Sequence, residues 1–371
     1  MSFLGYARYA PRIFRKRGTD PLYLIFFVTD RCNARCPHCL LGSGKPTGEG
    51  ELSLDEYEKI AEGMGPFLFL LLTGGEPFLR EDLADIARVF VKKNGVRNLG
   101  IPTNGSLTER VLEGTRRILA ENPGLDFAVD VSLDGIGEEH DRLRGVPGLF
   151  EKATRTLREL QTIERENAHF NANVCITMTG FNQDRVAELT RYVREKLKVR
   201  NVNNLVARPG ARDDHALDVD PEIYGAWVRD LRHATETKGL AGYHDYPGAD
   251  VVNAMKNLRQ DLVLRELRRE PPLVSCTAAT LAGVVYPNGD VYPCEVLRER
   301  IGNLREHGYD FRRVWFSERG EEVRRMIRET HCHCTFECFL TNNILFQPRM
   351  LPRVAWEWAR LKTRRALSRK G

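Results

Sequence analysis

The sequence predicts an α/β protein, in which a parallel sheet forms a partial (β/α)6 barrel and a small cysteine-rich α+β region follows it. Two observations predict this fold. Strand-like and helix-like segments alternate about six times between residues 22 and 207, which is typical of a parallel sheet with helical crossovers. The alternation then stops, and five of the nine cysteines fall between residues 275 and 347.

The individual elements follow from local patterns. The stretch 22–29 is rich in Leu, Ile, Phe and Val, as a strand buried on both faces is. Ser53 and Glu56 have the spacing of a capping box, so a helix begins there. Gly95 ends a helix that starts at Asp82. The other barrel elements are expected at 67–73, 97–103, 108–120, 127–133, 150–166, 170–178, 184–197 and 202–207.

The second half of the chain has a different pattern. Helices at 221–237 and 249–269 lead to the cysteine-rich region, where Asn288 and Gly289 predict a hairpin between strands at 281–286 and 290–294. A helix at 318–330 follows. The expected division is a basic N-terminal segment, the barrel, a helical linker, the cysteine-rich domain and a basic amphipathic tail, at 1–20, 21–215, 216–274, 275–347 and 348–371.

Composition favours a cytoplasmic protein. Of the 371 residues, 42% are hydrophobic and 29% charged, and no run approaches the roughly 20 apolar residues of a membrane span. Arg8 and Pro11 interrupt any signal-peptide core. Thiols stay reduced in the cytoplasm, so bunched cysteines indicate metal binding more than disulfides. The net charge of +5 is modest, and we expect no nucleic-acid partner.

The last segment has the pattern of a basic amphipathic helix. Its apolar residues recur at helical spacing among basic ones: Val354, Trp358 and Leu361 with Arg353, Arg360 and Arg364. Two explanations stay open. The helix lies on an anionic membrane surface, which would make the protein peripheral at the inner face of the membrane, or it packs on the protein's own core and leaves a solvated basic face.

Three cysteines, Cys32, Cys36 and Cys39, fall within eight residues after the first strand. A structural zinc site takes four ligands, and His38 would have to be the fourth. Because His38 directly follows Pro37 in a tight turn, its ring could not easily join both neighbouring thiols on one ion. A [4Fe–4S] cluster normally takes four cysteines, so with three, one iron stays open to bind a small molecule.

This loop, C-x3-C-x2-C after the first strand of an α/β barrel, is similar to the signature of the radical SAM superfamily. The resemblance implies that Cys32, Cys36 and Cys39 hold a [4Fe–4S] cluster whose fourth iron binds S-adenosylmethionine. It also implies reductive cleavage of that cofactor to a 5′-deoxyadenosyl radical, which abstracts hydrogen from a substrate. An electron donor such as flavodoxin or ferredoxin would then be a partner.

Further motifs stand at strand ends, where barrel active sites are built. The resemblance implies that the turn Thr73–Pro77 receives the amino group of the cofactor, with Gly74 and Gly75 allowing close backbone approach and Glu76 supplying negative charge. Ser132 and Arg144 would lie near the ribose and carboxylate, and Leu205 near adenine. The full set of expected cofactor-binding residues is His38, Gly74, Gly75, Glu76, Pro77, Thr103, Asn104, Ser132, Asp134, Arg144 and Leu205.

A second cysteine set, Cys276 and Cys294 with Gly289 between them, resembles the opening of a SPASM or twitch domain, which carries auxiliary iron–sulfur clusters. The sequence then departs from the full pattern and offers C-x-C-x3-C at 332–338. Two clusters would need about eight thiolates and five are present. We therefore expect one auxiliary [4Fe–4S] cluster.

Its ligands would be Cys276, Cys294 and two of Cys332, Cys334 and Cys338. The spacing of Cys334 and Cys338 fits the family's C-x3-C, but a C-x-C pair stays open. Zinc with His331 and His333 is an alternative occupant.

The resemblance also implies a catalytic base. In sulfatase-maturing relatives an acidic residue after the second cysteine takes a proton as the substrate radical is oxidised, and Glu295 stands in that place. The alternative is a solvated hairpin end. Tyr292 and Glu337 are weaker candidates. Cys175, alone in a strand, is expected to be a small buried hydrophobe.

The sequence is thus identified as a member of the radical SAM superfamily with a SPASM- or twitch-like domain. About 20 residues precede the first strand, too few for a peptide-recognition domain, which favours a small or lipid-linked substrate such as a sugar, cyclitol or isoprenoid. The auxiliary cluster would take part in substrate oxidation or bond formation. A maturase of ribosomal peptides is the alternative. A non-catalytic zinc scaffold or iron–sulfur electron carrier is the alternative of another class.

Overall fold

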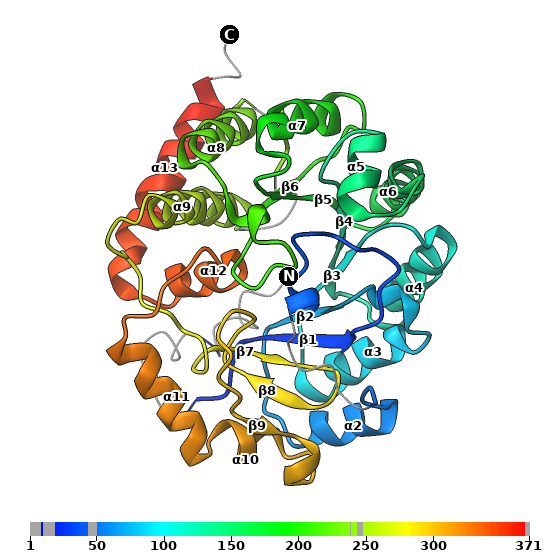
Figure 1. Cartoon of the computed structure of the whole chain (residues 1–371), viewed down its shortest axis with the longest axis vertical. Coiled ribbons are helices and arrows are strands. Elements are labelled where there is room, and N and C mark those ends of the chain that lie inside the picture. The colour runs from blue at the N-terminus through cyan, green and yellow to red at the C-terminus, as the bar shows by residue number, and fades with distance from the viewer. Residues whose placement is uncertain (1–8, 10–18, 44–49, 238, 243–247, 368–371) are drawn as a thin grey trace.

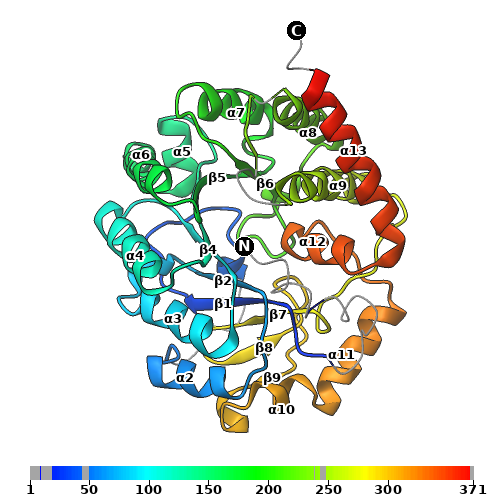
Figure 2. The same cartoon turned by 180° about the vertical axis from the view of Figure 1, so that it is seen from behind.

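One nine-stranded sheet organises the described part of the chain (Figures 1 and 2). The structure is a computed structural model, and it describes residues 9, 19–43, 50–237, 239–242 and 248–367. The expected basic segment 1–20 therefore lies outside the described residues, except for residues 9, 19 and 20. The strand order is β6-β5-β4-β3-β2-β1-β7-β8-β9.

Strands and helices alternate through the first part of the chain. The elements there are β1 (Tyr23–Thr29), α2 (Leu54–Glu62), β2 (Phe69–Gly74), α3 (Leu83–Asn94), β3 (Asn98–Thr103), α4 (Thr108–Glu121), β4 (Asp126–Ser132), α5 (Glu138–Arg144), α6 (Leu149–Glu166), β5 (Phe170–Met178), α7 (Val186–Glu195) and β6 (Val202–Val206). Each strand from β1 to β6 pairs in parallel with the next. The expected partial barrel is confirmed.

The second part of the chain is mostly helical. Its elements are α8 (Pro221–Glu236), α9 (Ala249–Leu267), β7 (Ala282–Val285), β8 (Asp290–Tyr292), β9 (Gly302–Asn303), α10 (Phe311–Trp315), α11 (Glu318–Glu329), α12 (Glu337–Leu345) and α13 (Leu351–Leu367). The short helices α5, α10 and α12 were not predicted, because five to nine residues carry too little helical periodicity to recognise.

The predicted helix caps and the predicted hairpin turn are all present in the structure. Ser53 and Glu56 form both hydrogen bonds of the capping box at the start of α2. Gly95 follows α3 with φ 64°, a left-handed conformation that glycine adopts at little cost. In the predicted hairpin, Gly289 has φ 84° and its N–H donates to the carbonyl of Tyr286 at 2.9 Å.

The barrel strands have two different faces. In β4, alternate residues such as Phe127, Val129 and Val131 are buried, and those between them are half-buried. The buried face packs under the helices, with α6 contacting both β4 and β5. The half-buried side chains, Asp130 and Ser132 among them, therefore point to the inner face of the barrel.

The cysteine-rich region joins this sheet directly. Strand β7 pairs in parallel with β1, with Tyr23 opposite Ala282, and β8 and β9 continue as antiparallel strands. Just before that pairing, the N–H of Leu22 donates to the carbonyl of Leu281 at 2.7 Å. The hairpin that carries Cys294 is thus an extension of the barrel sheet, on the side of β1 opposite β2.

Helix α13 packs along α9 and α8 at the edge of the molecule (Figures 1 and 2). Val354 and Leu361 are buried against them, while Trp358 is 36% exposed. The expectation of a helix packed on the protein's own core is therefore confirmed for two of the three apolar residues. No described helix combines the length and apolar character that crossing a membrane requires.

The turn after β2 gives a prediction. A Cβ on Gly75 would come within 2.1 Å of the carbonyl oxygen of Arg31, which belongs to backbone that cannot simply rotate away. We expect Gly75→Ala to lower the free energy of unfolding by about 3 kcal/mol, measured by urea unfolding. Gly239→Ala is the matched control, since its nearest contact would be an ordinary 3.6 Å. If the two substitutions lowered the free energy of unfolding equally, the backbone around Gly75 would not be crowded as described.

Candidate functional site

The first cysteine loop follows β1 at the carboxyl edge of the parallel strands. Cys36 is buried, Cys39 is half-buried and Cys32 is exposed, and all three are free thiols. Two backbone bonds fix the loop: the N–H of Arg35 donates to the carbonyl of Arg144 at 2.8 Å, and that of Asp213 to Pro37 at 2.9 Å. The loop thus presents its thiols from a backbone held at two points.

The glycine turn after β2 lies against this loop. A Cβ on Gly74, which has φ 153°, would come 2.1 Å from the carbonyl oxygen of Thr29. The N–H of Gly75 donates to that same oxygen at 2.8 Å, and that of Glu76 to Arg31 at 2.9 Å. Because these glycines have no side chain, the backbone of the turn can lie directly against the backbone of Thr29 and Arg31. This contact holds the end of β2 against the cysteine loop.

Glu76 connects the turn to the end of β3. Its carboxylate is 1% exposed and accepts from the Thr103 hydroxyl at 2.9 Å and from the Asn104 N–H at 2.7 Å. Burial raises the pKa of Glu76 to about 7, and those hydrogen bonds oppose the shift. Pro77 begins a buried turn of 3-10 helix. The amide of Asn104 donates to Asn33 in the cysteine loop at 2.8 Å.

Asp134, two residues beyond the end of β4, is the second buried carboxylate. It is 1% exposed, and Arg144 of α5 lies 2.5 Å from its Oδ2. His38 lies 3.5 Å from the same oxygen, and Oδ1 accepts from the N–H of Thr177 at 2.9 Å. Burial alone would raise the pKa of Asp134, but Arg144 and the neighbouring histidines lower it on balance. The cysteine loop, β4 and α5 meet at this carboxylate.

Buried polar atoms remain without a partner at this meeting point. Among the described residues, Nδ1 of His38 and Nε of Arg144 accept or donate no hydrogen bond. Burial lowers the pKa of His38 to about 4, so its ring is neutral at neutral pH. Burial raises the pKa of Cys36, and the positive charge of Arg144 opposes part of that rise. These two unpaired nitrogen atoms could hydrogen-bond to a polar, charged ligand that binds beside the three thiols.

The inner faces of β4 to β6 carry a polar cluster that the sequence did not reveal. Ser132 and Leu205, both expected at the cofactor, are half-buried there. One layer below Ser132, Asp130 accepts from the side-chain amides of Asn173 at 3.0 Å and Asn203 at 2.8 Å. Burial raises the pKa of Asp130. Alternating polar residues in a barrel strand are the signal that could have identified this cluster.

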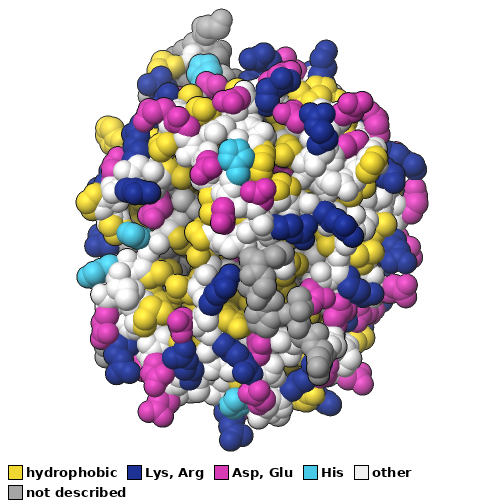
Figure 3. Space-filling view, viewed as in Figure 1, with side chains coloured by type: hydrophobic (Ala, Val, Ile, Leu, Met, Phe, Trp, Pro, Cys, Tyr) yellow, Lys and Arg dark blue, Asp and Glu magenta, His cyan; other side chains and the backbone are white. Residues whose placement is uncertain are grey.

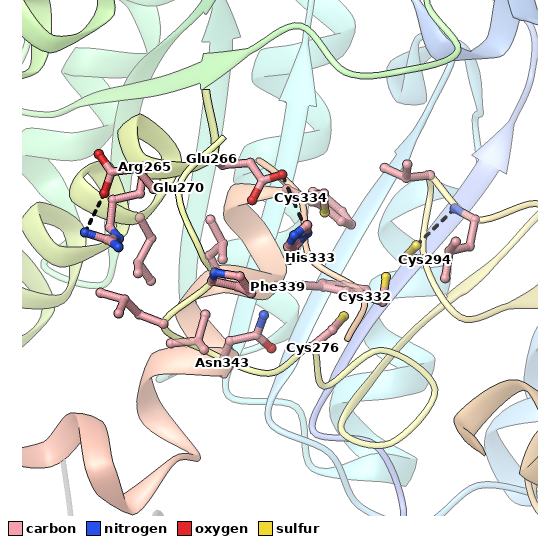
Figure 4. A pocket seen from close by; sticks show the side chains of 18 residues that line it. Arg265, Glu266, Glu270, Cys276, Cys294, Cys332, His333, Cys334, Phe339 and Asn343 are labelled. Atoms are coloured by element: carbon pink, nitrogen blue, oxygen red, sulfur yellow. Dashed lines mark hydrogen bonds and ion pairs between the residues drawn. The ribbon is translucent and has the colours of Figure 1, made fainter. Parts of the chain in front are cut away.

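The second cysteine set gathers around a cavity of about 100 Å³ (Figure 4). The thiols that line it are Cys276, Cys294, Cys332 and Cys334. The thiol of Cys276 is hydrogen-bonded to Cys332, and the N–H of Leu297 donates to the sulfur of Cys294 at 3.2 Å. Backbone donors to sulfur are among the features that tune iron–sulfur sites.

Cys338 is not part of that lining. It is half-buried on α12, and its sulfur accepts a hydrogen bond from Tyr23 of β1. The structure thus brings the C-x-C pair, and not the C-x3-C pair, to Cys276 and Cys294. His333 faces Glu266 at 3.7 Å at the cavity's edge (Figure 4).

A single-ion site is not formed by these side chains. Within the described ranges, no three His, Cys, Asp or Glu residues are grouped as one bound metal ion requires.

Glu295 directly follows Cys294 and is buried, so it is not a solvated hairpin end. Its side chain is 6% exposed and its Oε2 lies 2.7 Å from Nη1 of Arg208, in the loop after β6. The guanidinium of Arg208 also stacks on Phe336, 4.4 Å from the ring centroid. No local pattern indicated a role for Arg208, because its partners come from distant segments of the chain. Glu337 is buried too and accepts from the N–H of Val206 at 2.8 Å.

Comparisons with known proteins match both halves of this arrangement. Residues 26–193 match the family model of the radical SAM superfamily, and residues 276–339 match that of the SPASM iron–sulfur cluster-binding domain. The first match contains the loop with Cys32, Cys36 and Cys39. The second begins at Cys276 and extends one residue beyond Cys338.

Curated relatives and solved structures agree with these matches. The AdoMet-dependent heme synthase of Methanosarcina barkeri is 27% identical, over 83% of this chain and 85% of that protein. The antilisterial bacteriocin subtilosin biosynthesis protein AlbA of Bacillus subtilis is 26% identical, over 78% of this chain and 59% of that one. A structure of native anSMEcpe with bound AdoMet shares the fold, with a TM-score of 0.60, 18% identity and coverage of 94% and 100%.

Glu76 gives a prediction of pH dependence. Its pKa is about 7 in the folded protein against an ordinary 4.5, so its contribution to stability is fully present below about pH 4.5 and is lost as pH rises through 7. We expect the free energy of unfolding of the wild type to fall by on the order of 3 kcal/mol over this range relative to Glu76→Gln. Urea unfolding between pH 4.5 and 8 measures it.

The control for that experiment is Glu109→Gln, because the Glu109 side chain is 78% exposed. Its pH profile should parallel that of the wild type. A Glu76→Gln profile that also parallels the wild type would show that the buried carboxylate titrates normally.

Proposed function

Because the chain belongs to the radical SAM superfamily and carries a SPASM iron–sulfur domain, we propose that it is an enzyme that cleaves S-adenosylmethionine reductively and abstracts hydrogen from a small or lipid-linked substrate. One observation carries the proposal. The cysteine loop, the glycine turn and the Asp134–Arg144 pair meet at one edge of the sheet, and β1 connects that edge to the second cysteine set.

The cofactors supply the redox chemistry. When bound, a [4Fe–4S] cluster with S-adenosylmethionine provides a one-electron cleavage that generates a hydrogen-abstracting species, and flavodoxin or ferredoxin is the proposed electron source. Cys32, Cys36 and Cys39 would hold the cluster. Arg144, whose Nε is buried without a partner, would bind an anionic group of the cofactor, and Asp134 holds that guanidinium in place.

The remaining residues position the substrate and move protons. Asp130, Asn173 and Asn203 present hydrogen-bonding groups on the inner face, which suit the hydroxyl or amine groups of a polar small molecule. Arg208 orients the carboxylate of Glu295, the proposed proton acceptor, next to Cys294. The auxiliary cluster would accept an electron from the substrate or help to anchor it.

The relatives support a small substrate more than a peptide. The relative that matches 83% of the chain is named for heme synthesis, and heme is a small molecule. The match to AlbA, named for bacteriocin biosynthesis, spans 59% of that protein and favours the second candidate, a peptide maturase. Turnover of a short ribosomal peptide encoded beside this gene would support that candidate. A lipid-linked substrate would instead place the protein at a membrane surface.

The proposed chemistry predicts a cluster count. Anaerobically reconstituted protein should contain about eight irons and eight sulfides per chain and should form 5′-deoxyadenosine when S-adenosylmethionine and dithionite are added. Cys36→Ala should lower the iron to about four and abolish 5′-deoxyadenosine. Cys175→Ala is the control for iron content and should keep it.

Two outcomes would contradict this prediction. Zinc without sulfide would support a scaffold protein, and a full iron load without cleavage of S-adenosylmethionine would support an electron carrier.

The auxiliary site gives a separate prediction. We propose that Cys276, Cys294, Cys332 and Cys334 hold the second cluster and that Cys338 does not. Cys334→Ala should then lose about four irons, whereas Cys338→Ala should keep about eight. Both cysteines lie in the same short segment, so each variant is the control for the other. The reverse result would favour the C-x3-C pair.

A further inference from the structure

Helix α13 has two apolar faces, and among the described residues only one of them packs against the rest of the fold. The inner face is fixed by Val354 and Leu361 and by ion pairs from Arg360 to Glu236 and from Arg365 to Asp250. The opposite side, which we call the outer face, consists of exposed residues that are nearly all apolar. They are Pro352, Ala355, Trp356, Ala359, Thr363, Ala366 and Leu367.

Trp356 is the most prominent residue of the outer face. It is 73% exposed, and Leu367 is 64% exposed, the two highest values among the exposed large hydrophobic side chains of the described residues. Its neighbours on this face include two exposed alanines, Ala355 and Ala359. Since the inner face already anchors the helix, burial in the fold does not account for an exposed tryptophan.

Basic residues border this face on both sides. Arg353 and Arg364 lie along one side and Lys362 along the other, and all three are exposed. No salt bridge involves Arg353 or Arg364 within the described residues. The one acid of α13, Glu357, is buried and accepts from Asn257 at 2.7 Å. The exposed surface of the helix therefore combines apolar groups with cations and has no exposed carboxylate of its own. Basic and hydrophobic side chains both reach the surface along the edge where α13 lies (Figure 3).

We propose that the outer face of α13 docks on the surface of an anionic lipid bilayer, with Trp356 inserted at the level of the headgroups. The proposal deepens the proposed function and rests on its lipid-linked substrate class. A bilayer with anionic headgroups complements both features at once, because it takes up the apolar ridge and attracts the bordering cations. Tryptophan is the side chain most suited to that depth, with an apolar ring and one polar N–H.

The position of Arg353 connects this surface with the second cysteine set. Arg353 lines a cavity of about 290 Å³ together with Met350 and Leu258. That cavity shares four lining residues with the one that holds the cysteines: Leu262, Arg265, Glu270 and Leu273. A substrate whose lipid part stays in the bilayer would therefore meet the protein on the side of the auxiliary cysteines.

Vesicle flotation with the full chain tests the proposal. The protein should float with vesicles of phosphatidylcholine containing 30% phosphatidylglycerol and should stay behind with phosphatidylcholine alone. Binding should weaken in 0.5 M salt, because salt screens surface charge. Trp356→Ala should reduce binding at least tenfold, and Arg353→Gln with Arg364→Gln should reduce it about fivefold for each removed charge.

Matched substitutions far from α13 are the controls. Phe181→Ala removes a hydrophobic side chain that is 38% exposed, and Arg116→Gln removes an exposed charge from α4; neither should alter flotation. Binding should also shift the fluorescence of the wild type to the blue, and Trp356→Ala should lose most of this shift. Thermal unfolding midpoints of the variants should match the wild type, since all the substituted side chains are exposed.

The outcomes separate this proposal from the proposed function. Absence of flotation with anionic vesicles, or equal flotation of Trp356→Ala and wild type, overturns the membrane surface even if 5′-deoxyadenosine still forms. A dimer that Trp356→Ala dissociates would also overturn it, because a second copy would then cover the outer face. Flotation without cleavage of S-adenosylmethionine would leave the surface intact and overturn the proposed function.

Discussion

Strand β1 is hydrogen-bonded along both edges, and this pairing fixes the two cysteine sets relative to each other. On one side it pairs with β2, whose end carries the glycine turn, and on the other with β7, which begins the hairpin that leads to Cys294. The first cysteine loop continues from its carboxyl end. The separation between the two cysteine sets is therefore determined by backbone pairing and not by flexible side chains. A substrate bound between them would meet a rigid site.

Two buried carboxylates complete this frame. Glu76 connects the second and third strand ends, and Asp134 connects the fourth strand with the cysteine loop and α5. Buried carboxylates are costly unless they are hydrogen-bonded or paired, and both have several partners. The cysteine loop has little secondary structure of its own, so these polar contacts define its conformation.

Patterns within a few residues predicted the alternation of strands and helices, the caps at Ser53 and Gly95 and the motifs at the strand ends. Contacts between distant segments were not predictable in the same way. The pairing of β1 with β7 joins segments far apart in the chain, and Arg208 and Glu295 meet only once both halves have folded. In α13 the apolar spacing suggested Trp358 on the inner side, but the buried side includes Glu357, because Asn257 provides a partner for its carboxylate.

The shared sheet also limits how the chain can be divided. If the segment from β7 onward were removed, β1 would become an edge strand seven residues long, with the sequence Tyr-Leu-Ile-Phe-Phe-Val-Thr. Such an edge is long, apolar and without a charge, which is the combination that promotes strand addition from another molecule and aggregation. The iron–sulfur domain therefore also protects the barrel's solubility, and the two parts are expected to fold and unfold together as one cooperative unit.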